Sequence, residues 1–239
     1  REAYDGRGWS PFKEYDPNSK EWKGFAVDIY RQAFATLDIK VTFQEVVLGN
    51  QVQDLNSGRI DAMCDDGPWT LSSGKFVDYS NPAYYSVVYP YVRTTEKRFK
   101  TANDLDTSAV TFSGIDGDLS NDLVGRLFPK AKLASMPATS DVSQLYLNVA
   151  TGKADVAIAD PSSFSTFDKH NPHQVKPLKT QPLGVYKQVI SVKKGDTKML
   201  GLVNEAIDNA LAFGIIDRIL DGYDPTREKL MRVAPRYTK

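Results

Sequence analysis

Two aspartates, Asp66 and Asp160, end two stretches of sequence that repeat one pattern at a constant spacing of 94 residues. In each copy an amphipathic segment stops at a glycine, Gly58 or Gly152, and a short apolar run then leads to the aspartate. Glycine tolerates the left-handed turn that ends many helices, so each copy predicts a helix, a turn and a strand. Ligands of open α/β sheets bind beyond the carboxyl ends of the strands. We therefore expect Asp66 and Asp160 to face each other across a cleft between two similar lobes.

The composition of the chain argues against several other functions, including nucleic-acid binding and metal binding. Its 239 residues are 41% apolar with a formal net charge of zero, which allows a core in each lobe and makes nucleic acid an unexpected partner. The single cysteine, Cys64, lies in an apolar run and is expected to be buried. The two histidines, His170 and His173, are separated by Pro172, so we expect a surface loop there. No metal and no cofactor are expected.

The periodicity of apolar residues predicts two α/β units in succession. Helical spacing at 24–37 and 50–57, with strands at 40–47 and 60–64, gives a first βαβαβ lobe with a parallel sheet. The second unit follows the same order. Its predicted strands are 108–112 and 154–159, and its predicted helices are 120–128, 141–151 and 161–168.

Two further β-rich runs, near 89–93 and 187–192, are expected to cross between the lobes. The boundaries that follow are 1–93 and 188–239 for lobe 1, and 94–187 for lobe 2. Helices predicted near 200–211 and 215–220 would pack on the first lobe. Rigid lobes on a hinge of two strands can close around a ligand.

A set of short motifs, in order along nearly the whole chain, resembles one known family. The motifs are Trp9-Ser-Pro11-Phe12, Gly24-Phe-Ala-Val-Asp28, Leu55-Asn-Ser-Gly58-Arg-Ile-Asp61, Val77-Asp-Tyr-Ser80-Asn-Pro82, Val192-Lys-Lys-Gly195-Asp196 and Gly214-Ile-Ile-Asp217. With them the chain resembles the amino-acid-type (family 3) periplasmic solute-binding proteins of ABC importers. The resemblance implies a two-lobed α/β fold of the Venus-flytrap type. It also implies a monomer outside the cytoplasm, in the periplasm, that presents a small polar solute to a membrane permease.

The chain departs from this family where the family binds a carboxylate. The resemblance places Ser73 where the family's amino-acid receptors have an arginine, while Thr70 of the same motif is retained. Planar, bidentate recognition of a carboxylate is typical of arginine, so its absence argues against an ordinary α-amino acid as ligand. Lys75 is the only nearby cationic substitute.

The remaining residues of the matched site are acidic or aromatic. By resemblance, Asp160 matches the aspartate that binds the ligand's ammonium group, and Asp65 and Asp66 add acid where the family has small residues. Asp116 or Asp118 falls at or near the turn that binds carboxylate in the family. Trp9 and Trp69 fall at positions that face the ligand, and tryptophan is the best cation–π partner. Core positions for the tryptophans, and a solvated strand end for Asp65, are the alternatives.

These residues together predict a binding protein for a small cationic or amine-containing ligand, and not an enzyme. The predicted ligand-binding residues are Trp9, Phe12, Asp65, Asp66, Trp69, Thr70, Ser73, Asp116, Asp118 and Asp160. A sensor domain of a signalling receptor is one alternative, and a dehydratase-like enzyme on the same fold is another. A divalent cation held by Asp65, Asp66, Asp116 and Asp118 is a weaker alternative, because their spacing matches no known cation loop.

Overall fold

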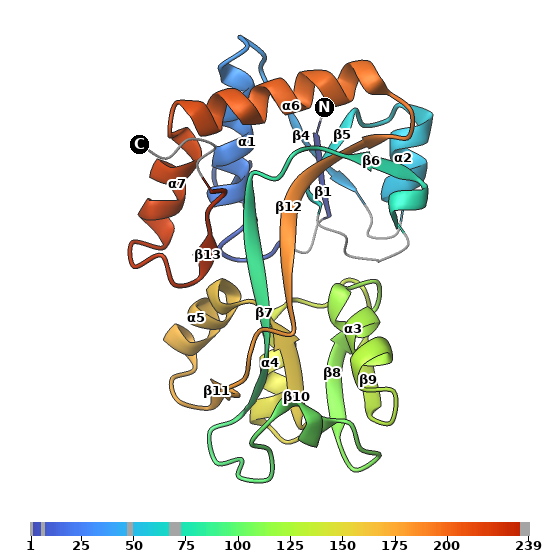
Figure 1. The fold of residues 1–239 in the computed structure, drawn as a ribbon, viewed down its shortest axis with the longest axis vertical. Helices are drawn as coiled ribbons and strands as arrows, with labels where there is room; N and C mark the ends of the chain where they lie inside the picture. The colour runs from blue at the N-terminus through green and yellow to red at the C-terminus, as the bar shows by residue number, and fades with distance from the viewer. Residues whose placement is uncertain (1, 6–7, 47–49, 67–72, 235–239) are drawn as a thin grey trace.

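The computed structural model describes residues 2–5, 8–46, 50–66 and 73–234, with residues 2–5, 65, 66 and 73 described by their backbone alone. It has two α/β lobes joined by two long strands (Figure 1). These strands, β7 (Tyr84–Arg93) and β12 (Gly184–Lys193), run side by side from one lobe to the other. The predicted two-lobed fold with a double-strand hinge is confirmed.

In the first lobe a parallel sheet has β1 at its centre, between β4 and β5. The bounds are β1 (Glu2–Asp5), α1 (Phe25–Ala35), β4 (Phe43–Val46), α2 (Gln51–Ser57) and β5 (Ala62–Asp66). The helix α2 ends at Gly58, whose φ of 72° is the left-handed conformation that the sequence pattern required.

The second lobe repeats this order of strands, with β8 between β9 and β10. The bounds are β8 (Thr111–Ile115), α3 (Leu119–Leu127), β9 (Lys132–Met136), α4 (Ser143–Ala150), β10 (Val156–Ala159) and α5 (Pro161–His170). Gly152 has a φ of 78° and follows α4 as Gly58 follows α2. The internal repeat therefore predicts the topology of both sheets.

Each hinge strand also completes a sheet. The strands β7 and β12 pair with each other over residues 84–88 and 184–188. Beyond that stretch β7 pairs with β10 in the second lobe, and β12 pairs with β5 in the first. Val88 and Val92 are buried in the second lobe's core, and we therefore propose a first boundary near residue 88 in place of residue 93. The second proposed boundary, at residue 188, is the last residue of β12 in this pairing.

The C-terminal helices cover the first lobe, as the sequence predicts. Buried side chains of α6 (Thr197–Ala212) and α7 (Ile215–Tyr223) join those of α1 in the core of that lobe. No single helix in the described part of the chain is long and apolar enough to cross a membrane, although α6 and α7 pass that test together as a pair bent by 70°.

Several short elements were not predicted. They are β2 (Glu14–Asp16), β3 (Glu21–Lys23), η1 (Ser73–Lys75), β6 (Val77–Tyr79), η2 (Ala102–Leu105), β11 (Val175–Pro177) and β13 (Leu230–Met231). The strand β9 was also missed. It lies at the edge of its sheet with four of its five residues exposed, so its sequence shows none of the alternation of a half-buried strand.

Candidate functional site

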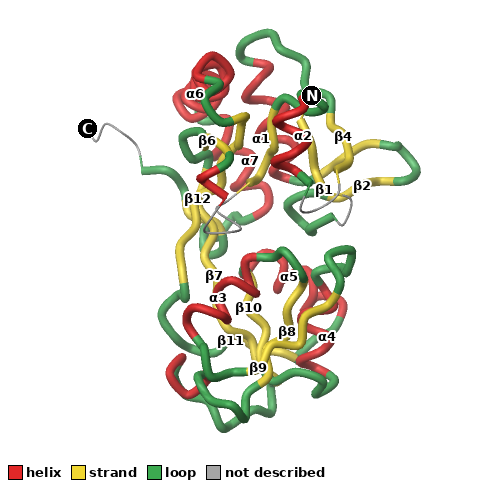
Figure 2. The backbone as a smooth tube through the Cα atoms, turned by 90° about the vertical axis from the view of Figure 1, so that its right-hand side faces the viewer, coloured by secondary structure: helices red, strands yellow, loops and turns green. Residues whose placement is uncertain are grey.

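Asp160 lies where the repeat predicts it, directly after β10, and it is the N-cap of α5. Its Oδ1 accepts hydrogen bonds from the backbone N–H groups of Ser162, at 2.8 Å, and Ser163, at 2.9 Å. Pro161 occupies the first turn of the helix, where no N–H donor is needed. The helices α3 and α5 both begin at the end of lobe 2 that is nearest lobe 1 (Figure 2).

Trp9 connects this aspartate to the other lobe. Its indole Nε1 donates a hydrogen bond to Asp160 Oδ2 at 3.2 Å. The indole also packs against the core of lobe 1 and against the apolar cluster around α4 and α5 in lobe 2. The turn that bears Trp9 is fixed by backbone bonds between Trp9 and both Phe12 and Lys13. A side chain of lobe 1 is therefore held against the N-cap of a helix in lobe 2.

The carboxylate of Asp160 is buried and has no cationic partner in the described part of the chain. It is 6% exposed, and its Oδ2 accepts a second hydrogen bond, from Ser163 Oγ, at 2.6 Å. Burial raises the pKa of Asp160 above its ordinary value of 3.8, while the bonds from Ser163, Trp9 and Ser162 act in the opposite direction. A cation placed beside a buried carboxylate would offset the cost of burying its charge.

Three aromatic rings pack together next to the start of α5. The ring of Phe164 is 4.6 Å from that of Tyr91 and 5.9 Å from that of Tyr146, between centroids. The Tyr146 hydroxyl is 2.9 Å from Ser163 Oγ. Burial raises the pKa values of Tyr91 and Tyr146 well above 10.0, so both phenols stay neutral at physiological pH.

None of these supporting residues was predicted from the sequence. The run Asp160-Pro-Ser-Ser163 is a helix N-cap signal that identifies the serines as partners of the aspartate. The sequence offers no comparable signal for the three aromatic rings.

The two aspartates that follow β8 have different surroundings. Asp118 is 7% exposed and is the N-cap of α3, where its Oδ1 accepts hydrogen bonds from the N–H and the hydroxyl of Ser120. Both Asp118 and Asp160 contribute to the raised pKa of Tyr146, so they share one neighbourhood. Asp116 is exposed and accepts a hydrogen bond from Ser135 on β9. Of this pair, Asp118 is the buried one that acts on Tyr146 together with Asp160.

Phe12 takes a different place from the one expected. It is 3% exposed, and its ring lies 4.6 Å from that of Phe25 in the core of lobe 1. Apolar burial accounts fully for this side chain, so we remove it from the candidate site.

Five predicted residues are not tested by the structure. Trp69 and Thr70 lie outside the described residues, and Asp65, Asp66 and Ser73 are described by their backbone alone. The backbone of Asp66 pairs with Val189 of β12, beside the hinge. Among the described residues, no group of three or more histidine, cysteine or acidic side chains is arranged to hold a metal ion.

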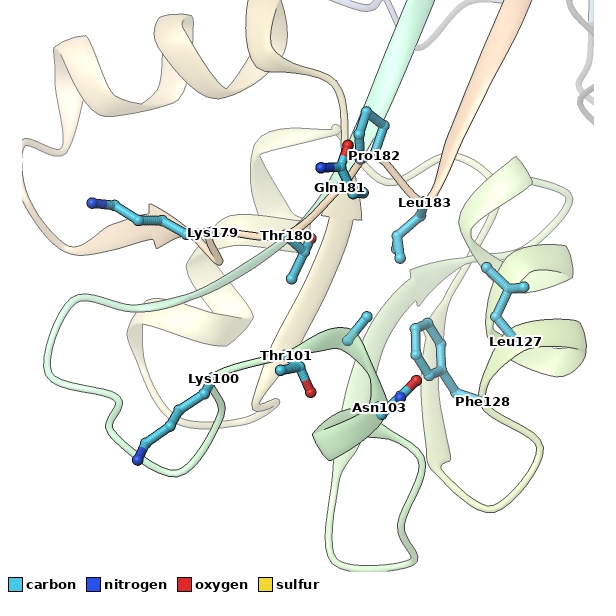
Figure 3. A pocket seen from close by; sticks show the side chains of 11 residues that line it. Lys100, Thr101, Asn103, Leu127, Phe128, Lys179, Thr180, Gln181, Pro182 and Leu183 are labelled. Atoms are coloured by element: carbon cyan, nitrogen blue, oxygen red, sulfur yellow. The ribbon is translucent and has the colours of Figure 1, made fainter.

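A separate cavity of about 490 Å³ opens on lobe 2 (Figure 3). It lies between the segment 179–183 that leads into β12, the start of η2 and the end of α3. Its apolar lining includes Phe128 and Leu183. The side chains of Lys100 and Lys179 point away from these two apolar residues (Figure 3). None of the predicted site residues lines this cavity, so it is separate from the Asp160 neighbourhood.

Comparison with known proteins agrees with the arrangement of lobes. The model of one family, the bacterial extracellular solute-binding proteins, family 3, matches residues 5–226. The chain belongs to this family. The resemblance carried by the sequence motifs is thereby confirmed.

The individual proteins that this chain is similar to are distant from it in sequence. A probable histidine-binding protein of Neisseria gonorrhoeae is 23% identical over 220 residues, which are 90% of this chain and 79% of that protein. The substrate-binding protein of an amino acid ABC transporter superposes with a TM-score of 0.78 at 22% identity, over 93% of this chain and 97% of its own. A histidine kinase sensor domain with similarity to periplasmic binding proteins gives a TM-score of 0.82 at 16% identity, over 97% of both chains. This chain shares its fold with both structures.

Proposed function

We propose that this protein is an extracytoplasmic receptor that captures a small organic cation between its lobes. The observation on which this rests is the buried carboxylate of Asp160, which a side chain from the opposite lobe reaches and no described lysine or arginine neutralises. The bound cation would supply a counter-charge to this carboxylate. Neutralising a buried charge in this way contributes more than the same contact does in bulk water, because the local dielectric constant is lower.

The charge of the ligand, rather than a carboxylate, is the feature that we expect the site to recognise. The proteins similar to this chain include a probable histidine-binding protein and the substrate-binding protein of an amino acid ABC transporter, and amino acids have an amine as well as a carboxylate. In this chain Ser73 stands where we expect the carboxylate-binding arginine, and no arginine occurs between Arg59 and Arg93. We therefore expect this site to bind the amine of such a ligand rather than its carboxylate.

Delivery to the permease of an ABC importer, in the periplasm and as a monomer, is the role that we propose. Binding without catalysis agrees with the relatives, which are binding proteins. The sensor domain of similar fold supports a second candidate, the input domain of a signalling receptor. The full gene distinguishes them: a downstream kinase or other signalling domain would favour sensing, and a neighbouring permease gene would favour transport.

A thermal-shift screen tests the ligand class directly. A ligand that binds only the folded protein raises its melting temperature by mass action. Organic cations should raise it, whereas their neutral isosteres and simple carboxylates should not. If glutamate or another acidic amino acid gave the largest shift, the proposed class would be wrong.

We expect the affinity for a cation to fall as the solution is made acidic. A cation binds the ionised carboxylate, and burial raises the pKa of Asp160 in the free protein. Binding is therefore strongest above this raised pKa and weakens as the pH falls through it, beginning above the ordinary value of 3.8. Calorimetric titrations from about pH 7.5 to about pH 4 measure this dependence. A flat profile over that range would show that Asp160 does not hold the ligand's charge.

Ligand binding should also close the two lobes. The connection through β7 and β12 is a paired ribbon of about five residues on each strand, and such a hinge permits rigid lobes to rotate. A ligand that touches both lobes shifts the population toward the closed form. Small-angle scattering should show a smaller radius of gyration at saturation than in the free protein. An unchanged radius would mean that the hinge does not move on binding.

A further inference from the structure

The hydrogen bonds around Asp160 leave little room for a ligand that must donate to it. An ionised carboxylate has about four acceptor positions on its two oxygens. In this structure four donors occupy them: the N–H groups of Ser162 and Ser163 on Oδ1, and Ser163 Oγ and Trp9 Nε1 on Oδ2. The negative charge is retained, but its hydrogen-bonding capacity is already used.

Three of these four donors belong to the N-terminus of α5 itself, at Ser162 and Ser163. The two backbone N–H bonds form the helix cap, so breaking them would leave N–H groups of the first turn without acceptors. Trp9 is the exception because it comes from lobe 1, and its bond is the longest of the four at 3.2 Å. Trp9 is therefore the donor that an incoming ligand would have to displace.

We infer that Trp9 determines specificity in this site, by occupying the acceptor position that a primary ammonium needs and so favouring fully alkylated ammonium ions. The inference rests on the proposed binding of a cation next to Asp160. A quaternary ammonium has no N–H to donate, and it interacts with a carboxylate through charge alone. It can approach Asp160 while the bond from Trp9 remains in place.

Trp9 is half-buried, so part of its surface is accessible to an alkylated cation. Tryptophan has the strongest cation–π interaction of the aromatic side chains, and quaternary ammonium groups are well suited to it because their charge is spread over methyl groups. A primary ammonium is smaller and more strongly hydrated. It would lose water on entering the site and would then have to break the Trp9–Asp160 bond to regain a hydrogen-bond partner.

Choline and ethanolamine are suitable probes because they differ only by three N-methyl groups, and the tert-butyl analogue of choline provides a neutral control. Isothermal titration should show that the wild-type protein binds choline at least about tenfold more tightly than ethanolamine, and the neutral analogue more weakly than choline. Trp9→Phe keeps an aromatic ring and removes the N–H. It should therefore raise the affinity for ethanolamine and reduce the ratio of the choline affinity to the ethanolamine affinity. Trp22→Phe is the matched control, because Trp22 is a second indole, 7% exposed in the core of lobe 1.

A second measurement needs no variant. The protein has three tryptophans, so the indole N–H signal of Trp9 can be assigned by nuclear magnetic resonance. Its protection from hydrogen exchange should persist when choline is added and should be lost when ethanolamine binds. This readout follows the Trp9–Asp160 bond itself and would not respond to a purely structural role.

The possible outcomes separate the inference from the proposed function. If neither choline nor ethanolamine binds and no other cation does so, the proposed function is wrong. If cations bind but ethanolamine is preferred, or Trp9→Phe lowers both affinities equally, the inference about Trp9 is wrong while the proposed function stands. If Trp9→Phe does not fold, the exchange measurement on the wild-type protein decides between these results.

Discussion

Replacing Asp160 by asparagine should reduce the affinity for a cationic ligand at least about tenfold, equivalent to about 1.4 kcal/mol. The substitution removes the buried negative charge and preserves the size of the side chain. Its remaining carbonyl oxygen can still accept the N–H bonds of Ser162 and Ser163, and asparagine is as good an N-cap as aspartate. Titration calorimetry on both proteins, with a cation identified by the thermal-shift screen, measures the change.

The Asp160→Asn variant should lose affinity without losing thermal stability. Because burial raises the pKa of Asp160, ionisation of this group above that pKa costs stability in the free protein, so a neutral side chain should leave the melting temperature unchanged or higher near neutral pH. Asp196→Asn is the matched control. Asp196 is the exposed N-cap of α6, where it accepts a hydrogen bond from Met199 N at 3.0 Å. Intact affinity with a lowered melting temperature in Asp160→Asn would mean that Asp160 serves only as a helix cap.

The topology of both lobes could be predicted from the sequence because it depends on local signals that occur twice. Gly58 and Gly152 each stop a helix, and an apolar strand follows each of them. Chains that alternate helix and strand form parallel sheets, so the order of these signals defines the sheet. The placement of Asp160 at a strand end follows from the same pattern.

The arrangement of side chains at the site could not be predicted in this way. The bond from Trp9 to Asp160 joins residues 151 positions apart, and its geometry depends on how the two lobes meet at the hinge. The family motif places Phe12 beside Trp9, but the motif cannot show that one ring enters the core while the other reaches the opposite lobe. The edge strand β9 was missed for a related reason, since its exposed residues have no pattern of burial to display.

Replacing Gly24 by alanine should destabilise the protein by about 3 kcal/mol or more and should disturb the turn that bears Trp9. Gly24 is the N-cap of α1 and has φ 121° and ψ 161°. Residues that have a Cβ rarely adopt this backbone conformation. A Cβ at this position would lie 2.3 Å from the backbone oxygen of Phe12 and 2.9 Å from the backbone nitrogen of Lys13. These are backbone atoms of the turn itself, so the clash can be relieved only by moving the turn away from α1.

The effect on the site should accompany the effect on stability. For a protein of this size, a loss of about 3 kcal/mol lowers the melting temperature by roughly 6–12 °C. Gly201→Ala is the matched control: Gly201 lies within α6, where an added Cβ would meet no atom within 4 Å, so alanine should be neutral or stabilising there by up to about 1 kcal/mol. Denaturant unfolding compares the two variants, and the exchange rate of the Trp9 indole N–H reports on the site. If Gly24→Ala retained wild-type stability and left that N–H protected, the close contact between Gly24 and Phe12 would not be what positions Trp9 against Asp160.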